Sequence, residues 1–187
     1  PKLWQSAGFL VLTALGLGLA SPARLQAWSE TAAFGERIIF SKSSDYQRIV
    51  LTSEGVEMRL YLNGHLQFSS RDEYRYHEAL VHVGMRDLPQ AKQVLVLGGG
   101  DGMALREILK YPEVESATLV DLDPAVTDLF KSHPALVQLN AGALNSPKVT
   151  VVNADAFIWA KQAAPGYDFI VVDFPDPTNF SLGKLYS

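Results

Sequence analysis

The chain has 187 residues, 48% of them hydrophobic, which suits one α/β domain with a small second unit. Its net charge is −4, and its 16 Lys and Arg residues are spread along the sequence, which argues against a nucleic-acid-binding surface. The absence of Cys excludes disulfides, thiolate metal sites and cysteine nucleophiles.

The first 36 residues form a separate N-terminal segment that contains an apolar stretch. Residues 7–20 carry no charge and one polar side chain, Thr13, but a membrane span needs roughly 20 residues. The end of a transmembrane helix, the apolar part of a signal peptide and a buried helix are three competing interpretations, and the missing start methionine counts against the second. Because the chain also stops just after an apparent active-site loop, we expect a piece of a longer or processed protein.

Residues 37–70 are predicted to form a small antiparallel β domain. Turn residues separate short β-rich stretches, and Asn63-Gly64 is the strongest hairpin signal in the chain. The predicted strands cover residues 37–40, 46–51, 58–62 and 65–68. Helical spacing of apolar residues follows over residues 73–84.

Residues 71–187 alternate between buried strands and helices with short connections, which predicts a parallel, doubly wound sheet. The predicted strands are residues 94–97, 117–120, 148–152 and 169–172. The predicted intervening helices end near residue 109, span residues 125–131 and span residues 157–163. We expect a Rossmann-like domain over these residues.

An acidic residue lies near the carboxyl end of each predicted parallel strand, where open α/β sheets bind ligands. Any one Asp could simply cap a helix or stabilise a turn. The repeated placement favours a ligand site over that structural explanation. The residues are Asp101, Asp121, Asp155 and Asp173, with a fifth at Asp176.

The glycine loop after the first parallel strand, residues 98–102, reads G-x-G-x-G. Met103 occupies the position of the third glycine of the nicotinamide fingerprint, so the loop is more typical of adenosylmethionine binding. Asp121 is placed to accept hydrogen bonds from both ribose hydroxyls. Asp155 is placed to meet the adenine amino group, with Ala156 beside the ring.

Asp101 separates two classes of donor. Backbone N–H groups near such a loop favour the α-carboxylate of intact S-adenosylmethionine. An Asp inside the loop would repel that carboxylate, but it would attract the terminal ammonium of the decarboxylated donor. Asp101 therefore favours decarboxylated S-adenosylmethionine.

Several motifs, in the same order, together resemble the polyamine aminopropyltransferase (spermidine synthase) family over residues 37–187. The later segments look most like the long bacterial members that carry several transmembrane helices. The motifs are Tyr46-Gln47, the run from Asp72 to Glu78, Gly98 to Gly102 with Leu105-Arg106-Glu107, Asp173 to Pro177, and Gly183 to Tyr186.

The resemblance implies that the Rossmann-like domain is of the S-adenosylmethionine-methyltransferase type and is incomplete, truncated at its C-terminus. It also implies a reaction and a set of roles. An aminopropyl group would pass from decarboxylated S-adenosylmethionine, a co-substrate, to a diamine such as putrescine, with no prosthetic group and no metal. Asp173 would be the catalytic proton acceptor. The donor would contact Gln47, Gly98, Gly100, Asp121, Asp155 and Ala156, and the amine would contact Tyr76, His77, Asp101, Asp173 and Asp176.

Two departures from the family pattern affect the predicted site. The family often has Glu where Asp121 stands, and Asn179-Phe180 replaces a common Gly-Pro pair. A methyltransferase stays open as an alternative because it would share the glycine loop, Asp121 and Asp155. The truncated fold and the Asn179-Phe180 departure leave open a non-catalytic, membrane-attached polyamine-binding domain. We expect a bacterial homodimer at the inner membrane with a cytoplasmic catalytic domain, or a soluble cytoplasmic protein, and the chain alone to be inactive.

Overall fold

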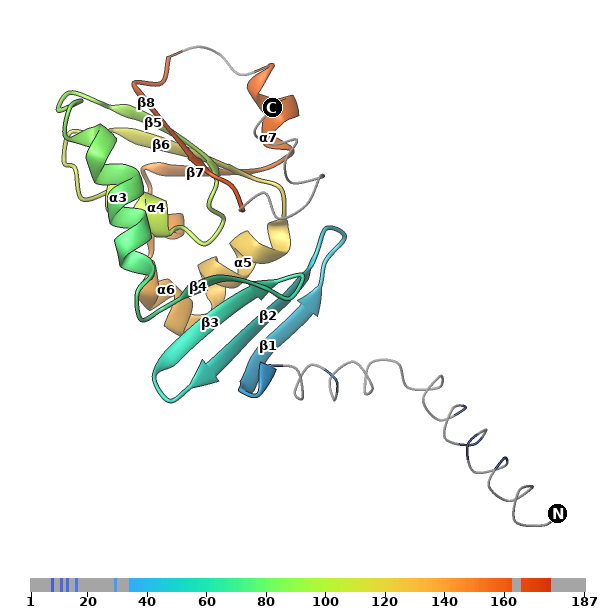
Figure 1. Cartoon of the computed structure of the whole chain (residues 1–187). Coiled ribbons are helices and arrows are strands. Elements are labelled where there is room, and N and C mark those ends of the chain that lie inside the picture. The colour runs from blue at the N-terminus through green and yellow to red at the C-terminus, as the bar shows by residue number, and fades with distance from the viewer. Residues whose placement is uncertain are drawn as a thin grey trace.

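The computed structural model describes residues 34–162 and 166–175, together with residues 8, 11, 13, 16 and 29. The predictions for Asp176, for Asn179-Phe180 and for most of the apolar stretch fall outside these residues. The two long described segments build two four-stranded sheets, one antiparallel and one parallel (Figure 1). This arrangement confirms the predicted fold class.

The first sheet is antiparallel with the strands in sequence order. Asn63 and Gly64 both have positive φ, at 52° and 81°, as a type I′ hairpin turn requires. The turn after the first strand begins later than expected, at Ser44, whose backbone N–H donates to the carbonyl of Gln47. The strands are β1 (Arg37–Ser43), β2 (Arg48–Glu54), β3 (Glu57–Leu62) and β4 (His65–Ser69).

The second sheet is parallel, in the order β7-β6-β5-β8. The chain moves from β5 outward to β7 and then returns to the other side of β5 with β8. The topological switch point therefore lies between β5 and β8, the place where open α/β sheets bind ligands. The strands are β5 (Gln93–Gly98), β6 (Ser116–Asp121), β7 (Val149–Asn153) and β8 (Phe169–Asp173).

The helices match the prediction except between β6 and β7. A short helix and a 3-10 turn there escaped the sequence analysis because their apolar residues are too few to show a period. The last helix ends earlier than the predicted residue 163. The elements are α3 (Glu73–Met85), α4 (Met103–Ile108), α5 (Pro124–Ser132), α6 (Pro134–Leu139), η1 (Ala143–Asn145) and α7 (Ala156–Ala160).

A single cluster of buried side chains joins the two sheets. Leu51 and Leu60 of the first sheet and Val96 of the second are fully buried members of it. The rings of Phe68 on β4 and Phe130 on α5 meet edge-on, with centroids 5.9 Å apart. The small sheet is therefore packed against the parallel domain, which fixes the β1–β2 turn relative to the sheet's ligand-binding edge.

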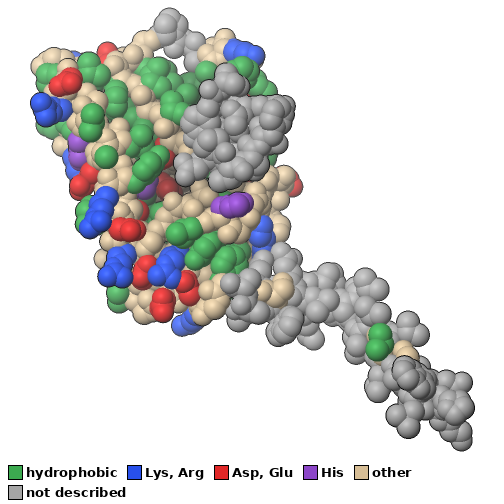
Figure 2. Space-filling model, viewed as in Figure 1, with side chains coloured by type: hydrophobic (Ala, Val, Ile, Leu, Met, Phe, Trp, Pro, Cys, Tyr) green, Lys and Arg blue, Asp and Glu red, His purple; other side chains and the backbone are tan. Residues whose placement is uncertain are grey.

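Among the described helices, none is long and apolar enough to cross a membrane. The visible face in Figure 2 shows basic and acidic side chains intermixed, with no continuous basic patch.

Candidate active site

The glycine loop lies directly against the end of β8. Gly98 and Gly99 have φ of 82° and 66°, a left-handed conformation that favours glycine. The Gly99 N–H donates to the Asp173 carbonyl at 3.0 Å, and a Cβ on Gly98 would lie 2.2 Å from that oxygen. The loop and Asp173 are therefore held together at the switch point.

Backbone N–H groups hold the Asp121 carboxylate at the end of β6. Gly100 donates to Oδ2 at 3.0 Å, and Asp123 donates to Oδ1 at 2.9 Å. Burial, followed by the negative charges of Asp123 and Asp173, raises the pKa of Asp121 despite these hydrogen bonds. Each carboxylate oxygen keeps a second lone pair for a ligand hydroxyl. A Cβ on Gly100 would lie 2.7 Å from the carboxylate, so this approach needs glycine.

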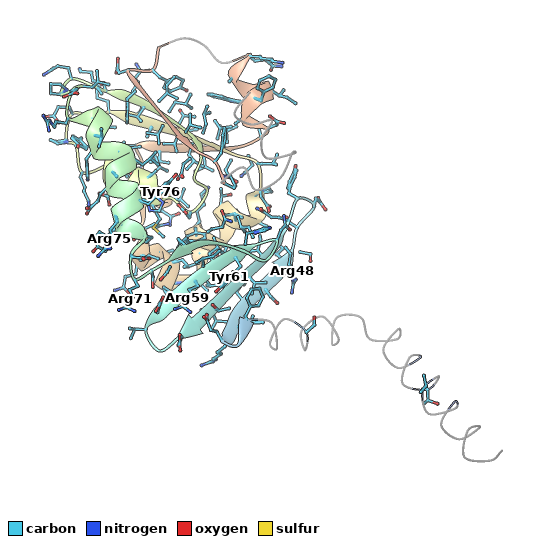
Figure 3. All side chains as sticks on the ribbon, viewed as in Figure 1. Arg48, Arg59, Tyr61, Arg71, Arg75 and Tyr76 are labelled. Atoms are coloured by element: carbon cyan, nitrogen blue, oxygen red, sulfur yellow. The ribbon has the colours of Figure 1, made fainter. Side chains whose placement is uncertain are left out.

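Asp173 is the predicted proton acceptor, and its side chain is only 10% exposed. The hydroxyl of Tyr76, labelled on α3 in Figure 3, donates to Oδ1 at 2.9 Å. Burial and the negative charge of Asp101 raise the pKa of Asp173 to about 6. A carboxyl with this pKa is ionised at neutral pH and is a better base than an ordinary Asp.

Asp101 and His77 complete a cluster with Asp173. The acceptor atoms of the three side chains all lie within 4.8 Å of one another, and His77 Nε2 is 3.9 Å from Asp173 Oδ2. Loss of hydration raises the pKa of Asp101, although its Oδ1 accepts from the Met103 N–H at 2.9 Å. By spacing alone, the cluster would fit either an ammonium group or a metal ion.

Glu73 contacts His77 from within the same helix. His77 Nδ1 lies 2.8 Å from Glu73 Oε2 and 2.9 Å from the Glu73 carbonyl oxygen. Burial would lower the pKa of His77, but the Glu73 hydrogen bond and the charges of Asp101 and Asp173 outweigh it and raise this pKa. Glu73 had no predicted role, although its i, i+4 spacing from His77 is visible in the sequence.

Gln47 reaches the parallel domain through Asp123, which the sequence analysis also missed. The Gln47 amide donates to Asp123 Oδ2 at 2.9 Å, and the Ser44 hydroxyl donates to the same oxygen at 2.6 Å. The other oxygen accepts from the Ala125 N–H and caps α5. The Asp-Pro pair at residues 123–124 is a recognisable helix start that could have identified this cap.

Asp155 stands apart from the cluster. It is exposed, and its Oδ1 accepts from the N–H groups of Phe157 and Ile158 at 2.8 and 3.1 Å, which caps α7. Within residues 34–162 and 166–175, no interaction joins Asp155 to Asp101, Asp121 or Asp173. The contacts of Asp155 and of Ala156, the first residue of α7, with an adenine ring stay predictions.

An ionic network connects α3 and α4, and Glu73 links this network to His77. Arg106 contacts Glu73 at 2.7 Å and Glu107 at 2.8 Å, and the side chain of Glu107 is 1% exposed. His82 bridges Glu107 and the Tyr111 hydroxyl at 2.9 and 2.8 Å. His77 contacts Glu73 and His82 contacts Glu107, so the two rings lie in different surroundings.

Comparison with known proteins identifies the family. The Spermine/spermidine synthase domain model matches residues 73–187. Polyamine aminopropyltransferase 2 of Ralstonia nicotianae is 60% identical over 178 residues, which cover 95% of this chain and 35% of the relative. The polyamine aminopropyltransferase of Leptospira interrogans is 55% identical, with coverage of 95% and 36%.

Solved structures agree with these relatives. A spermidine synthase in complex with the transition state analogue AdoDATO superposes with a TM-score of 0.74 and 35% identity, over 81% of this chain and 51% of that one. Spermidine synthase from Thermotoga maritima gives a TM-score of 0.68 at 35% identity, with coverage of 73% and 48%. The chain spans about a third of the length of the curated relatives it matches. It belongs to the spermine/spermidine synthase family.

Proposed function

We propose that the protein transfers an aminopropyl group from decarboxylated S-adenosylmethionine to a diamine such as putrescine, giving spermidine and methylthioadenosine. One observation carries this proposal: two partly buried carboxylates, Asp101 and Asp173, face each other beside the glycine loop with raised pKa values. Within the described residues, neither forms an ion pair with Lys or Arg. Two such carboxylates suit a cationic ligand better than an anionic one.

The chemistry requires a deprotonated amine. An amine with a pKa of roughly 10 costs about 4 kcal/mol to deprotonate at pH 7, at 1.36 kcal/mol per unit. Asp173 accepts the proton, and the amine lone pair then attacks the carbon attached to the sulfonium. The C–S bond breaks, its electrons return to sulfur, and neutral methylthioadenosine leaves. Tyr76 holds the Asp173 carboxylate in place for this transfer.

The donor side of the proposal depends on Gly100 and Asp121. The absence of a Cβ at Gly100 leaves the Asp121 carboxylate accessible to a ribose, and Asp101 lies farther along the same loop. A donor that retained its α-carboxylate would meet the negative charge of Asp101. Gln47, Asp155 and Ala156 complete the proposed donor site, and Asp176 the proposed diamine site.

Calorimetry with the full-length protein tests the choice of donor. We expect decarboxylated S-adenosylmethionine to bind at least tenfold more tightly than the intact form. Stronger binding of the intact form, or methyl transfer to an amine, would favour a methyltransferase.

An activity assay tests the reaction and the metal question together. We expect spermidine and methylthioadenosine to form in equal amounts from putrescine and the decarboxylated donor. Prior treatment with EDTA should leave the rate unchanged if the cluster of His77, Asp101 and Asp173 holds an ammonium group. A rate that EDTA abolishes and Mg²⁺ or Zn²⁺ restores would assign that cluster to a metal.

The acceptor, the homodimer and the inner-membrane location stay predictions. Competition among diamines of different lengths tests the first. Sedimentation of the full-length protein and fractionation of the cells that produce it test the other two.

A further inference from the structure

The first residue of α3, Glu73, is a buried carboxylate that the proposed chemistry does not use. Its side chain is 3% exposed and lies one helical turn before His77. Arg106 contacts both of its oxygens, with Nη1 2.7 Å from Oε1 and Nη2 3.1 Å from Oε2. Arg106 also donates to the Leu139 carbonyl at 2.9 Å, which fixes the guanidinium between α3 and the end of α6.

The groups around His77 determine which of its two ring nitrogens carries the hydrogen in the neutral form. Both neighbours of Nδ1, the Glu73 carbonyl at 2.9 Å and the Glu73 carboxylate at 2.8 Å, are oxygens. A carbonyl can only accept, and the carboxylate stays ionised because Arg106 holds a permanent charge against it. Nδ1 must therefore donate. In the neutral ring, Nε2 then keeps its lone pair, which faces Asp173.

We propose that Glu73 is a positioning residue of the amine site. Held by Arg106, it fixes the hydrogen of His77 on Nδ1 and so presents Nε2 as a third acceptor beside Asp101 and Asp173. An alkylammonium group has three N–H donors, and with N···O distances near 2.9 Å its acceptors stand about 4.7 Å apart. The three acceptors here lie no more than 4.8 Å apart, and Nε2 is 3.9 Å from Asp173 Oδ2, so a single ammonium group is large enough to contact all three. The identity of the ammonium ligand rests on the proposed function, but the hydrogen position on His77 does not.

The hydrogen position can be measured without substrate. In full-length protein labelled with ¹⁵N at histidine, NMR correlations distinguish a protonated Nδ1 from a protonated Nε2, and a His77→Gln variant assigns the signals. We expect the neutral ring of His77 to carry its hydrogen on Nδ1 in the wild type. A neutral ring protonated on Nε2 would overturn the proposal, whatever the enzyme's activity.

Two matched variants separate positioning from structural support. Glu73→Gln and Glu107→Gln each remove one buried carboxylate from Arg106, but only the first contacts His77. We expect Glu73→Gln to lower kcat/KM for the diamine at least tenfold, with donor affinity within twofold of wild type. Glu107→Gln should stay within threefold for both quantities, and thermal melting should verify that both variants fold.

The pH dependence of kcat/KM separates positioning from structural support, because a purely structural role of Glu73 would not shift this pH dependence. The groups facing His77 are Glu73 and Tyr76 on α3, Asp101 in the glycine loop and Asp173 on β8. Loss of the Glu73 charge should move the acidic limb of kcat/KM to lower pH, because His77 then loses its proton more easily. Equal losses in the two variants, or wild-type kinetics in Glu73→Gln, would reject a positioning role. If the wild type transferred no aminopropyl group, the proposed function would fail and the NMR measurement would decide this inference alone.

Discussion

Two neighbouring groups of buried carboxylates have pKa values that are shifted in opposite directions. Burial would raise the pKa of Glu73 and Glu107, but hydrogen bonds and charges from His77, Arg106 and Lys110 outweigh it and lower both values. Burial raises the pKa of Asp101 and Asp173, and among the described residues no Lys or Arg forms an ion pair with either of them. The side chains of Glu73 and Glu107 are 3% and 1% exposed, and that of Asp173 is 10% exposed.

The difference shows that the partner, rather than burial, decides the electrostatic state of these groups. The network between α3 and α4 satisfies its own charges and supports the fold. The carboxylates at the switch point keep an unfavourable charge that a bound cation would relieve. Such a division between satisfied and strained groups is expected where a site is prepared for a ligand.

Asp173→Asn gives the largest expected effect. Loss of a general base typically costs 10²–10⁴ in rate, so we expect turnover to fall by roughly 10³, with donor affinity within a few-fold of wild type. Product formation by chromatography and donor calorimetry measure the two quantities. Asp168→Asn, a change just before the other end of β8, should stay within about twofold. Near-normal turnover in Asp173→Asn would remove the residue from the proton-transfer step.

Arg106→Leu should disrupt the ionic network between α3 and α4 and so destabilise the fold. Removing one partner of a buried ion pair costs about 3–5 kcal/mol, because Glu73 and Glu107 would each lose this guanidinium partner. Urea unfolding of the full-length protein measures the loss. Arg86→Leu is the control, since the Arg86 side chain is 87% exposed, and it should change stability by no more than about 0.5 kcal/mol. A loss in Arg106→Leu as small as the control's would show that the network does not stabilise the fold.

The pH dependence of stability should differ in sign between the two regions. Asp173 titrates near 3.8 when unfolded and about 6 when folded, so its contribution is favourable below pH 3.8 and is lost as pH rises through 6. At 1.36 kcal/mol per unit, Asp173→Asn should therefore gain up to about 3 kcal/mol over wild type between pH 4 and 7.

Glu107→Gln should show the opposite trend. The lowered pKa of Glu107 stabilises the fold above its unfolded value of 4.5, and this contribution is lost as pH falls. The variant should thus be less stable than wild type at pH 7 and approach it in acid. Parallel pH curves for the two variants, measured by denaturant unfolding, would contradict the distinction between the regions.

Gly100→Ala should give the smallest effect and act on the donor side. Its new methyl group would lie 2.7 Å from the Asp121 carboxylate, which must then move. We expect donor affinity to fall about tenfold, roughly 1.4 kcal/mol, while the pKa of Asp173 is retained. Calorimetry and the pH profile check the two parts, and unchanged donor affinity would place the ribose away from Asp121.

The sequence alone determined the class of fold and most of the site's members. Mostly apolar runs mark the parallel strands that end in Asp121 and Asp173, and Asn63-Gly64 has few alternatives to a hairpin. These signals are local, because each depends on the conformational limits of single residues or on the pattern of apolar residues over a short stretch of sequence. They are sufficient to place the acidic residues at one edge of a parallel sheet.

Only the tertiary structure decided which of those acidic residues act together. It separated Asp155, which caps α7, from Asp101 and Asp173, which meet His77 across three different elements. It also revealed Glu73 and Asp123, whose partners lie far away in the sequence. Raised and lowered pKa values arise from burial and from such distant partners together, and no local pattern contains that information.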